Sequence, residues 1–272
     1  MPIDPGPRGV PMTSPFARVS RASQPAVDQP LSPLPAAGHI FDRTLRLTPT
    51  DLDGGHCLRP DGVARHMHET GIEHLAAKHL LAGNPHWTVR RTVVDIIEPI
   101  VYPAELRLRR WCSGLASMWS AMRLRLDSDT GGLVETEGFW VHLNPDTLNP
   151  ARISDRYLQL MATTAAPDPL LWRPWLRPPL PASIGDRFPL RRSDFDHLGQ
   201  LAAVTYWAAV YEYITDAADV TARPHRYILE CHKPVRLGEH VDIYTDRGRD
   251  GLTIWFAVDR DVRALAQLRR AP

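Results

Sequence analysis

Two segments of the chain repeat apolar side chains at helical spacing, which predicts one amphipathic helix in each half. The first helix is expected over about residues 60–81 and the second over about residues 200–214. Pro60 suits the first turn of a helix, and Gly83 fits the position that caps a helix at its C-terminus. The repeating positions are Val63, Met67, Gly71, Ile72 and Leu75 in the first segment and Leu201, Val204, Ala208 and Tyr211 in the second.

Strand-like alternation of apolar and charged side chains follows each predicted helix. Leu106 and Leu108, for example, alternate with Glu105 and Arg107. The Asp-Thr-Gly-Gly stretch at 129–132 is a hairpin turn signal. Strands are expected at 41–48, 88–97, 105–112, 119–127 and 133–143 in the first half, and at 227–235, 241–245, 252–258 and 262–268 in the second.

The order of a helix and then an antiparallel meander therefore occurs twice. One long helix wrapped by a curved antiparallel sheet is the hot-dog arrangement. The pattern predicts an α+β fold of two tandem hot-dog modules, at residues 39–165 and 186–272, that pair into one continuous sheet as a pseudo-dimer.

Two proline-rich segments flank and divide these modules. Residues 1–38 contain few large apolar side chains and are expected to form a disordered tail, because they cannot bury enough surface to offset their ordering entropy. Residues 166–185 also carry Trp172 and Trp175, which a free linker would not need. We expect this linker to lie along the folded surface in an extended form.

The composition of the chain argues against several classes of protein. A net charge of +1 gives no strongly basic field for nucleic acid. Cys57, Cys112 and Cys231 are too widely spaced for a structural zinc site or a disulfide framework. No apolar run approaches the roughly 20 residues of a membrane span. We therefore expect a cytoplasmic protein without metal or cofactor, either a monomer or a homodimer of the double module.

Three stretches of the chain resemble motifs of the acyl-acyl-carrier-protein thioesterases of plants and bacteria. Residues 87–92 (Trp-Thr-Val-Arg-Arg-Thr) and residues 139–147 (Phe-Trp-Val-His-Leu-Asn-Pro-Asp-Thr) are similar to two strand motifs of that family. Residues 193–206 are similar to its catalytic stretch, with matches at Ser193, Asp194, Asp196, Val204 and Tyr206. The resemblance spans about residues 40–265 and implies hydrolysis of a fatty acyl thioester of acyl carrier protein or CoA.

The catalytic stretch also departs from the family pattern. Leu198 stands where the family has Asn, and Gln200 stands where it has His. Ala202–Ala203 replace an Asn pair, and Glu230 aligns with the downstream acidic position only if an insertion is allowed. These departures leave open a non-catalytic protein that binds an acyl chain without hydrolysing it.

Thioester hydrolysis needs a positioned water and donors for the developing oxyanion. Asp196 lies just before the second helix and is the first candidate base, with Gln200 as an orienting group and Glu230 as a further member. Backbone amides at the helix N-terminus can bind the oxyanion. The alternative role for Asp194 and Asp196 is to cap the helix.

The loop before the first helix offers a rival site. Asp53 as base and His56 as orienting donor resemble the start of many single hot-dog thioesterases, although one residue is missing between them. Asp51 and His56 also have the spacing of the hot-dog hydratase signature, which keeps an enoyl-thioester hydratase as an alternative. Otherwise this stretch is a glycine-rich loop with a solvent-facing histidine.

Other residues have a structural and a functional interpretation. In the functional interpretation, an acyl channel is lined by Val63, Met67, Ile72 and Leu75. In the structural interpretation, these four side chains form ordinary core. The arginines of two neighbouring strands either bind acidic carrier protein or pair with Glu135 and Glu137, and pairing is the favoured interpretation. Cys231 is favoured as a small buried side chain over a nucleophile. Solvated or core roles are favoured over metal binding for His66, His68 and His74.

Overall fold

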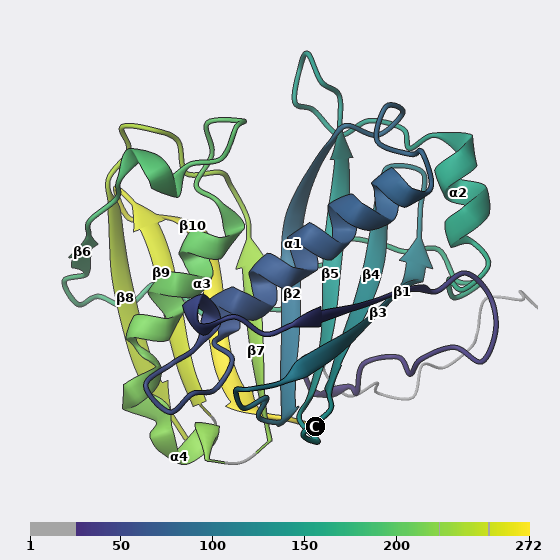
Figure 1. Ribbon diagram of the computed structural model, residues 1–272. Coiled ribbons are helices and arrows are strands. Elements are labelled where there is room, and N and C mark those ends of the chain that lie inside the picture. The colour runs from purple at the N-terminus through teal and green to yellow at the C-terminus, as the bar shows by residue number, and fades with distance from the viewer. Residues whose placement is uncertain (1–25, 223, 250) are drawn as a thin grey trace, which may run out of the picture.

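One ten-stranded antiparallel sheet runs through the whole molecule (Figure 1). The structure is a computed structural model that describes residues 26–272 except 223 and 250. The strand order is β1-β3-β4-β5-β2-β7-β10-β9-β8-β6. The first module supplies β1 (Phe41–Arg46), β2 (His86–Glu98), β3 (Glu105–Leu115), β4 (Trp119–Ser128) and β5 (Leu133–Leu143). The second supplies β6 (Asp186–Phe188), β7 (His225–Cys231), β8 (Val241–Gly248), β9 (Gly251–Val258) and β10 (Asp261–Arg270).

Two helices, α1 (Pro60–Ala77) and α3 (Ala203–Glu212), pack side by side on one face of this sheet (Figure 1). Two shorter helices are α2 (Asp155–Met161) and α4 (Ala218–Thr221), which the apolar pattern did not predict. Single 3₁₀ turns lie at Ala26–Asp28, Pro49–Asp51, Arg192–Asp194 and Ile214–Ala217.

The first helix is shorter than predicted. It ends at Ala77 with Lys78 as its cap, so Gly83 is not the C-terminal cap. His79 takes a left-handed conformation with φ of 54°, which turns the backbone out of the helix before residue 81.

The two halves repeat the same strand order outward from the β2–β7 seam. From the seam, the first module runs β2, β5, β4, β3 and β1, and the second runs β7, β10, β9, β8 and β6. Each module also lays one main helix on the same face. This confirms the predicted pair of hot-dog modules, and it adds the short strand β6 as the counterpart of β1.

Two buried ion pairs cross the seam. In the register of β2 with β7, Arg91 lies opposite Glu230 and Asp95 lies opposite Arg226. The Arg226 guanidinium binds both Asp95 oxygens at 2.6 Å, and Arg91 Nη1 lies 3.1 Å from Glu230 Oε1. The two pairs exchange roles across the seam, as expected for two modules related by a pseudo-two-fold axis.

The face of the sheet away from the helices is covered in part by extended chain. Trp175 and Leu176 of the linker pack there against Ile228 and Trp255. This is the extended course along the surface that the two tryptophans predict. The tryptophans supply the apolar area that holds a proline-rich segment in place.

Part of the expected tail lies on the same face. Val27 and Leu31 join that apolar cluster, and the Val27 carbonyl accepts a hydrogen bond from Arg226 at 3.0 Å. Residues 26–38 therefore differ from the disorder predicted for 1–38, because Arg226 and the apolar cluster bind them. Residues 1–25 lie outside the described residues.

Candidate active site

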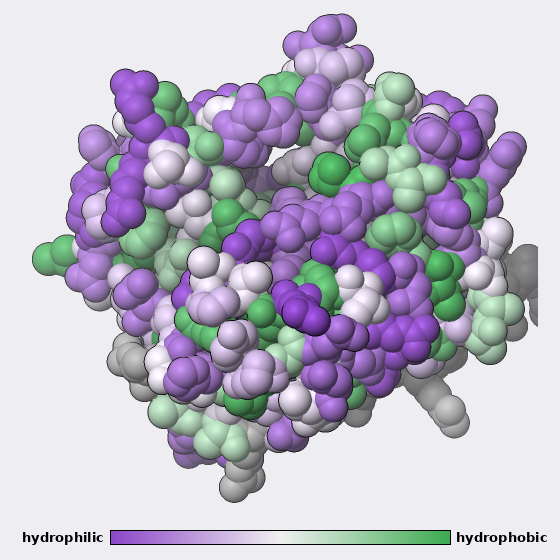
Figure 2. Space-filling view, viewed as in Figure 1, coloured by the Kyte–Doolittle hydropathy of each residue, from purple (hydrophilic) through white to green (hydrophobic). Residues whose placement is uncertain are grey.

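A cleft of about 460 Å³ lies at the upper end of the seam. The strands β2 and β7 pair only between Arg91 and Ile96, and past Arg91 they separate. The cleft is lined from both modules, by His68 and Trp87 of the first and by Asp196, Gln200 and Ala203 of the second. Figure 2 shows the surface hollowed at this place, above α1.

Asp196 lies in a tight loop that enters α3. Its Oδ1 accepts hydrogen bonds from the backbone amides of Leu198 at 2.9 Å and Gln200 at 3.0 Å. The carboxylate is exposed, and its Oδ2 has no hydrogen-bond partner among the described residues. One oxygen therefore fixes the loop while the other is available to a water molecule in the cleft.

The N-terminus of α3 lies beside this carboxylate. Its cap, Ala202, has no side-chain acceptor, and the next residue, Ala203, lines the cleft. The amides of Ala203 and Val204 have no acceptor in the described part of the chain. Unpaired amides at a helix N-terminus form a partial positive charge that suits an oxyanion.

His68 reaches the same cleft from α1 of the other module. Its ring meets the Trp140 ring edge-on, with 4.8 Å between the centroids. Burial lowers the pKa of His68 to about 4, although the negative charge of Asp196 acts in the opposite direction. The imidazole is therefore neutral at pH 7 and lies within the electrostatic reach of Asp196.

Sequence reasoning missed His68 as a site residue. His66 and His74, on the same helix, are buried, and no group of three His, Cys, Asp or Glu side chains among the described residues is placed to hold a metal ion. A signal for His68 was present, because His68 and Tyr211 lie at equivalent distances from the starts of α1 and α3. Aligning the two halves by their Asp loops identifies this pair.

The rival residues Asp53 and His56 do not line the cleft. Asp53 Oδ1 accepts from the amides of Gly55 and Cys57, both at 2.8 Å, in the same loop geometry as Asp196. His56 is exposed and has a φ of 63°. Asp51 is buried and bound to Arg65, so it does not form the pair with His56 that the hydratase signature requires.

Glu230 and Cys231 lie on opposite faces of β7. Glu230 points away from the helices, and its Oε2 accepts hydrogen bonds from the amides of Trp175 and Leu176. Burial would raise the pKa of Glu230, but His232, these hydrogen bonds and Arg91 hold it below its ordinary value. The structure therefore does not bring Glu230 to Asp196, and its role is to hold the seam and the linker.

Cys231 does line the cleft, on the side of the helices. Burial raises the pKa of its thiol to about 12. The thiol is therefore protonated at neutral pH and is a poor nucleophile. Cys231 is half-buried rather than fully buried.

The predicted acyl-lining residues divide into two groups. Val63 and Met67 are buried in the core beneath α1. Ile72 and Leu75 line a second pocket, of about 130 Å³, between α1 and the sheet. Only the second pair therefore borders open space.

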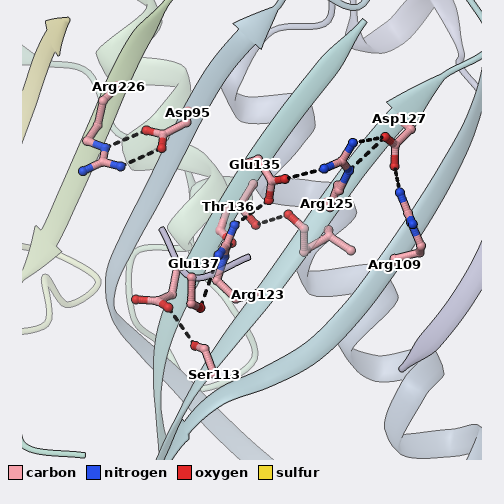
Figure 3. Close-up of polar contacts among 12 residues, drawn as sticks. Asp95, Arg109, Ser113, Arg123, Arg125, Asp127, Glu135, Thr136, Glu137 and Arg226 are labelled. Atoms are coloured by element: carbon pink, nitrogen blue, oxygen red, sulfur yellow. Dashed lines mark hydrogen bonds and ion pairs between the residues drawn. The ribbon is translucent and has the colours of Figure 1, made fainter. Parts of the chain in front are cut away.

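The outer-face arginines are paired within the sheet (Figure 3). Arg109 and Arg125 bind Asp127, and Arg123 and Arg125 bind Glu135. Arg107 binds Asp42 of β1. This agrees with ion pairing across the strands rather than a free basic surface for carrier protein.

Comparison with known proteins agrees with this architecture. The model of the acyl-ACP thioesterase N-terminal domain matches residues 38–161, and that of the acyl-ACP thioesterase C-terminal domain matches residues 179–263. The chain belongs to the acyl-ACP thioesterase family. Membership of this family supports thioesterase activity on an acyl thioester. The family resemblance predicted from the three sequence motifs is confirmed.

Relatives cover nearly the whole chain. An uncharacterized protein of Mycobacterium tuberculosis is 41% identical over 244 residues, which are 90% of this chain and 97% of that protein. An acyl-ACP thioesterase from Bacteroides thetaiotaomicron has a TM-score of 0.68 at 13% identity, covering 85% of this chain and 97% of its own. A 12:0-ACP thioesterase from Umbellularia californica has a TM-score of 0.67 at 15% identity, covering 87% and 98%.

The structural likenesses establish the shared double hot-dog fold. Within residues 26–222, 224–249 and 251–272, no helix has both the length and the apolar character needed to cross a membrane.

Proposed function

We propose that this family member hydrolyses an acyl thioester in the seam cleft, with Asp196 as the base that activates water. The observation that carries the proposal is that the Asp196 carboxylate borders the same cleft as the open N-terminus of α3 and the neutral His68. A base, an oxyanion donor and a polar orienting group meet at one opening, as hydrolysis requires.

The proposed reaction adds one water to the thioester carbonyl. Asp196 takes a proton as the water oxygen bonds to the carbonyl carbon, and the amides at the start of α3 stabilise the oxyanion. The C–S bond then breaks, and the leaving thiolate takes the proton that Asp196 had accepted from the water, which restores the Asp196 carboxylate. The products are a carboxylic acid and a free thiol, and the Gln200 amide orients the carbonyl or the water by hydrogen bonding.

Cations at the cleft suit the phosphate of a phosphopantetheine arm, which acyl carrier protein and CoA share. Arg90 and Arg236 line the cleft, and neither forms an ion pair with a described residue. Lys233 also lines it but is bound to Asp261 at 2.8 Å. The proposal therefore covers both carriers, and a direct assay of the two distinguishes them.

The test is release of free thiol from acyl-CoA and acyl-carrier-protein substrates, with Asp196→Asn compared against Asp53→Asn. Both substitutions keep the Oδ1 acceptor that holds each loop, so they form a matched pair. We expect Asp196→Asn to lower kcat about 100-fold or more, in the range of a lost general base. Asp53→Asn should change it less than about twofold, in line with a surface substitution.

Equal losses in the two variants would refute the assignment of Asp196. Wild-type protein that binds acyl thioesters without releasing thiol would refute hydrolysis and support the acyl-binding alternative. Hydration of an enoyl-CoA without thiol release would support the hydratase alternative.

A further inference from the structure

The second pocket, between α1 and the sheet, contains a buried positive charge. Most of its lining is apolar or aromatic, including Ile72, Leu75, Trp87 and Trp140. Arg110 of β3 also lines it, and the side chain of this arginine is 6% exposed. A guanidinium in such surroundings is unfavourable unless an anion or strong acceptor balances it.

Arg110 differs from the other buried arginines of the described chain. Arg91, Arg123 and Arg226 each bind a carboxylate. Arg110 has no carboxylate partner among the described residues, and its one hydrogen bond there joins Nη1 to His74 Nδ1 at 2.7 Å. Its Nε and Nη2 have no hydrogen-bond partner in the described part of the chain, so this edge of the guanidinium is available to a ligand.

The neighbouring histidines do not balance this charge. Burial, Arg110 and His39 together lower the pKa of His74 to about 2, so its ring is neutral. His74 Nδ1 accepts from Arg110, which assigns the His74 proton to Nε2, where it is donated to His39 at 2.7 Å. This chain of bonds positions Arg110 and leaves its full charge in place.

A glycine on α1 leaves the guanidinium uncovered. The Cβ of any larger residue at Gly71 would lie 3.7 Å from Arg110 Nη2. Glycine in a helix interior lowers helix stability relative to alanine. The absence of a side chain here keeps the pocket open in front of Arg110.

The pocket adjoins the proposed active site. His68 and Trp87 line both the seam cleft and the second pocket. Gly71 follows His68 on α1 by less than one turn, a rise of about 5 Å at most. An acyl chain that passes His68 from the cleft therefore meets Arg110 after only a few carbon atoms.

We propose that the acyl group of the substrate carries a carboxylate a few carbons from the thioester, and that Arg110 binds this carboxylate. This inference rests on the proposed function, because it assigns the acyl chain of that substrate to the second pocket. The Nε and Nη2 edge of Arg110 fits two carboxylate oxygens, and the anion supplies the charge that the pocket lacks.

The test compares glutaryl-CoA with pentanoyl-CoA, which have the same chain length and differ in the terminal carboxylate. Wild-type kcat/KM should favour glutaryl-CoA by about tenfold or more, as expected for a hydrogen bond to a charged group. Arg110→Met should abolish the preference, so that kcat/KM in this variant is about equal for the two substrates. Arg107→Gln, on the same strand with its side chain in the exposed pair with Asp42, should keep the preference.

A second variant tests the site if Arg110→Met does not fold. Gly71→Leu keeps Arg110 and covers its guanidinium, so it should also remove the glutaryl preference. Equal kcat/KM for the two substrates, or a preference that persists in both variants, would overturn the inference. A 5-hydroxypentanoyl-CoA that performs as well as glutaryl-CoA would overturn the requirement for a carboxylate.

Binding separates this inference from the proposed function. Isothermal titration with the monoamide of glutaric acid and with pentanamide needs no turnover, and only the first of these carries a carboxylate. Wild-type protein should bind the glutaric monoamide more tightly than pentanamide, while Arg110→Met should not. If no thioester is hydrolysed and the monoamide still binds through Arg110, the proposed function fails and the carboxylate site stands. If thioesters are hydrolysed and the monoamide binds no more tightly than pentanamide, the carboxylate site fails and the proposed function stands.

Discussion

The loops that enter α1 and α3 have the same backbone but different surroundings. In each loop an aspartate amide donates to the carbonyl four residues on, at 2.9 Å for Asp53 and 2.8 Å for Asp196. The turn residue before that carbonyl is left-handed in both, with φ of 63° at His56 and 68° at Gly199. By this correspondence Cys57, not His56, is the counterpart of Gln200.

Apart from the shared aspartates, the side chains around the two loops differ at the positions that bear on chemistry. The first helix begins with Pro60, which has no amide hydrogen, where the second begins with Ala203. The Arg59 guanidinium lies 5.7 Å from the Tyr211 ring centroid at the first loop, and Ala202 leaves the second loop open. Burial and the nearby Asp53 raise the pKa of Tyr211, whereas its counterpart His68 lies in the cleft near Asp196.

The comparison teaches that the two modules share the backbone structure of these loops but differ in the groups that could take part in a reaction. Backbone hydrogen bonds hold both loops, so the aspartates persist in both as structural acceptors. Only the second loop combines a free helix N-terminus with an open cleft. In the proposed site its partner residue, His68, comes from the other module, so that site would need both modules of the pseudo-dimer.

The two buried ion pairs of the seam should contribute equally to the free energy of unfolding, even though the two loops differ. Glu230→Gln and Asp95→Asn each remove the charge from one buried pair, and each should lower the free energy of unfolding by about 3 kcal/mol. Urea titration of both variants measures this. Arg107→Gln, in an exposed pair, should change it by less than about 1 kcal/mol. A seam loss confined to one variant would break the two-fold comparison.

Much of the fold was predictable because each half follows a regular period. The alternation of Leu106 and Leu108 with charged residues, and the helical repeat over Val63 and Met67, correspond to the burial that the structure has. The end of α1 was not predictable, because His79 takes the left-handed turn that glycine usually supplies at the end of a helix. Strand β6 is too short to show a period.

The candidate site was predictable only in part. Asp196 and Gln200 follow from local sequence, because one loop holds both. His68 and Arg110 come from distant elements. Only the tertiary fold shows that His68 borders the cleft and that Arg110 borders the second pocket. Glu230 was a candidate because it aligns with the acidic position of the family motif. Neighbouring residues of a strand point to opposite faces, so Glu230 faces the linker while Cys231 faces the cleft.

A proline at the first residue of α3 should lower activity, whereas the proline at the first residue of α1 should have no effect on it. Ala203→Pro removes one amide from the proposed oxyanion site, and Ala202 already has φ −65° and ψ 143°, which a following proline tolerates. Loss of one oxyanion donor predicts a fall in kcat of about 100-fold. The reverse change, Pro60→Ala, should leave kcat unchanged. Thiol-release kinetics of the two variants, with unfolding curves as the control, measure this. Unchanged kcat in Ala203→Pro would exclude the Ala203 amide from the oxyanion site.

The smallest difference should come from His68 and Tyr211, the equivalent positions on the two helices. His68→Gln keeps a polar group beside Asp196 but loses the imidazole geometry, and we expect kcat to fall about tenfold. Tyr211→Phe should leave kcat unchanged, since Tyr211 does not line the cleft. Because the His68 pKa is about 4, its ring stays neutral between about pH 6 and 8, and the His68→Gln defect should be the same across that range. A defect that disappears toward pH 8 would mean that wild-type His68 acts as a cation. Equal defects at the two positions would mean that the helices support the sheet alike and that the chemistry lies elsewhere.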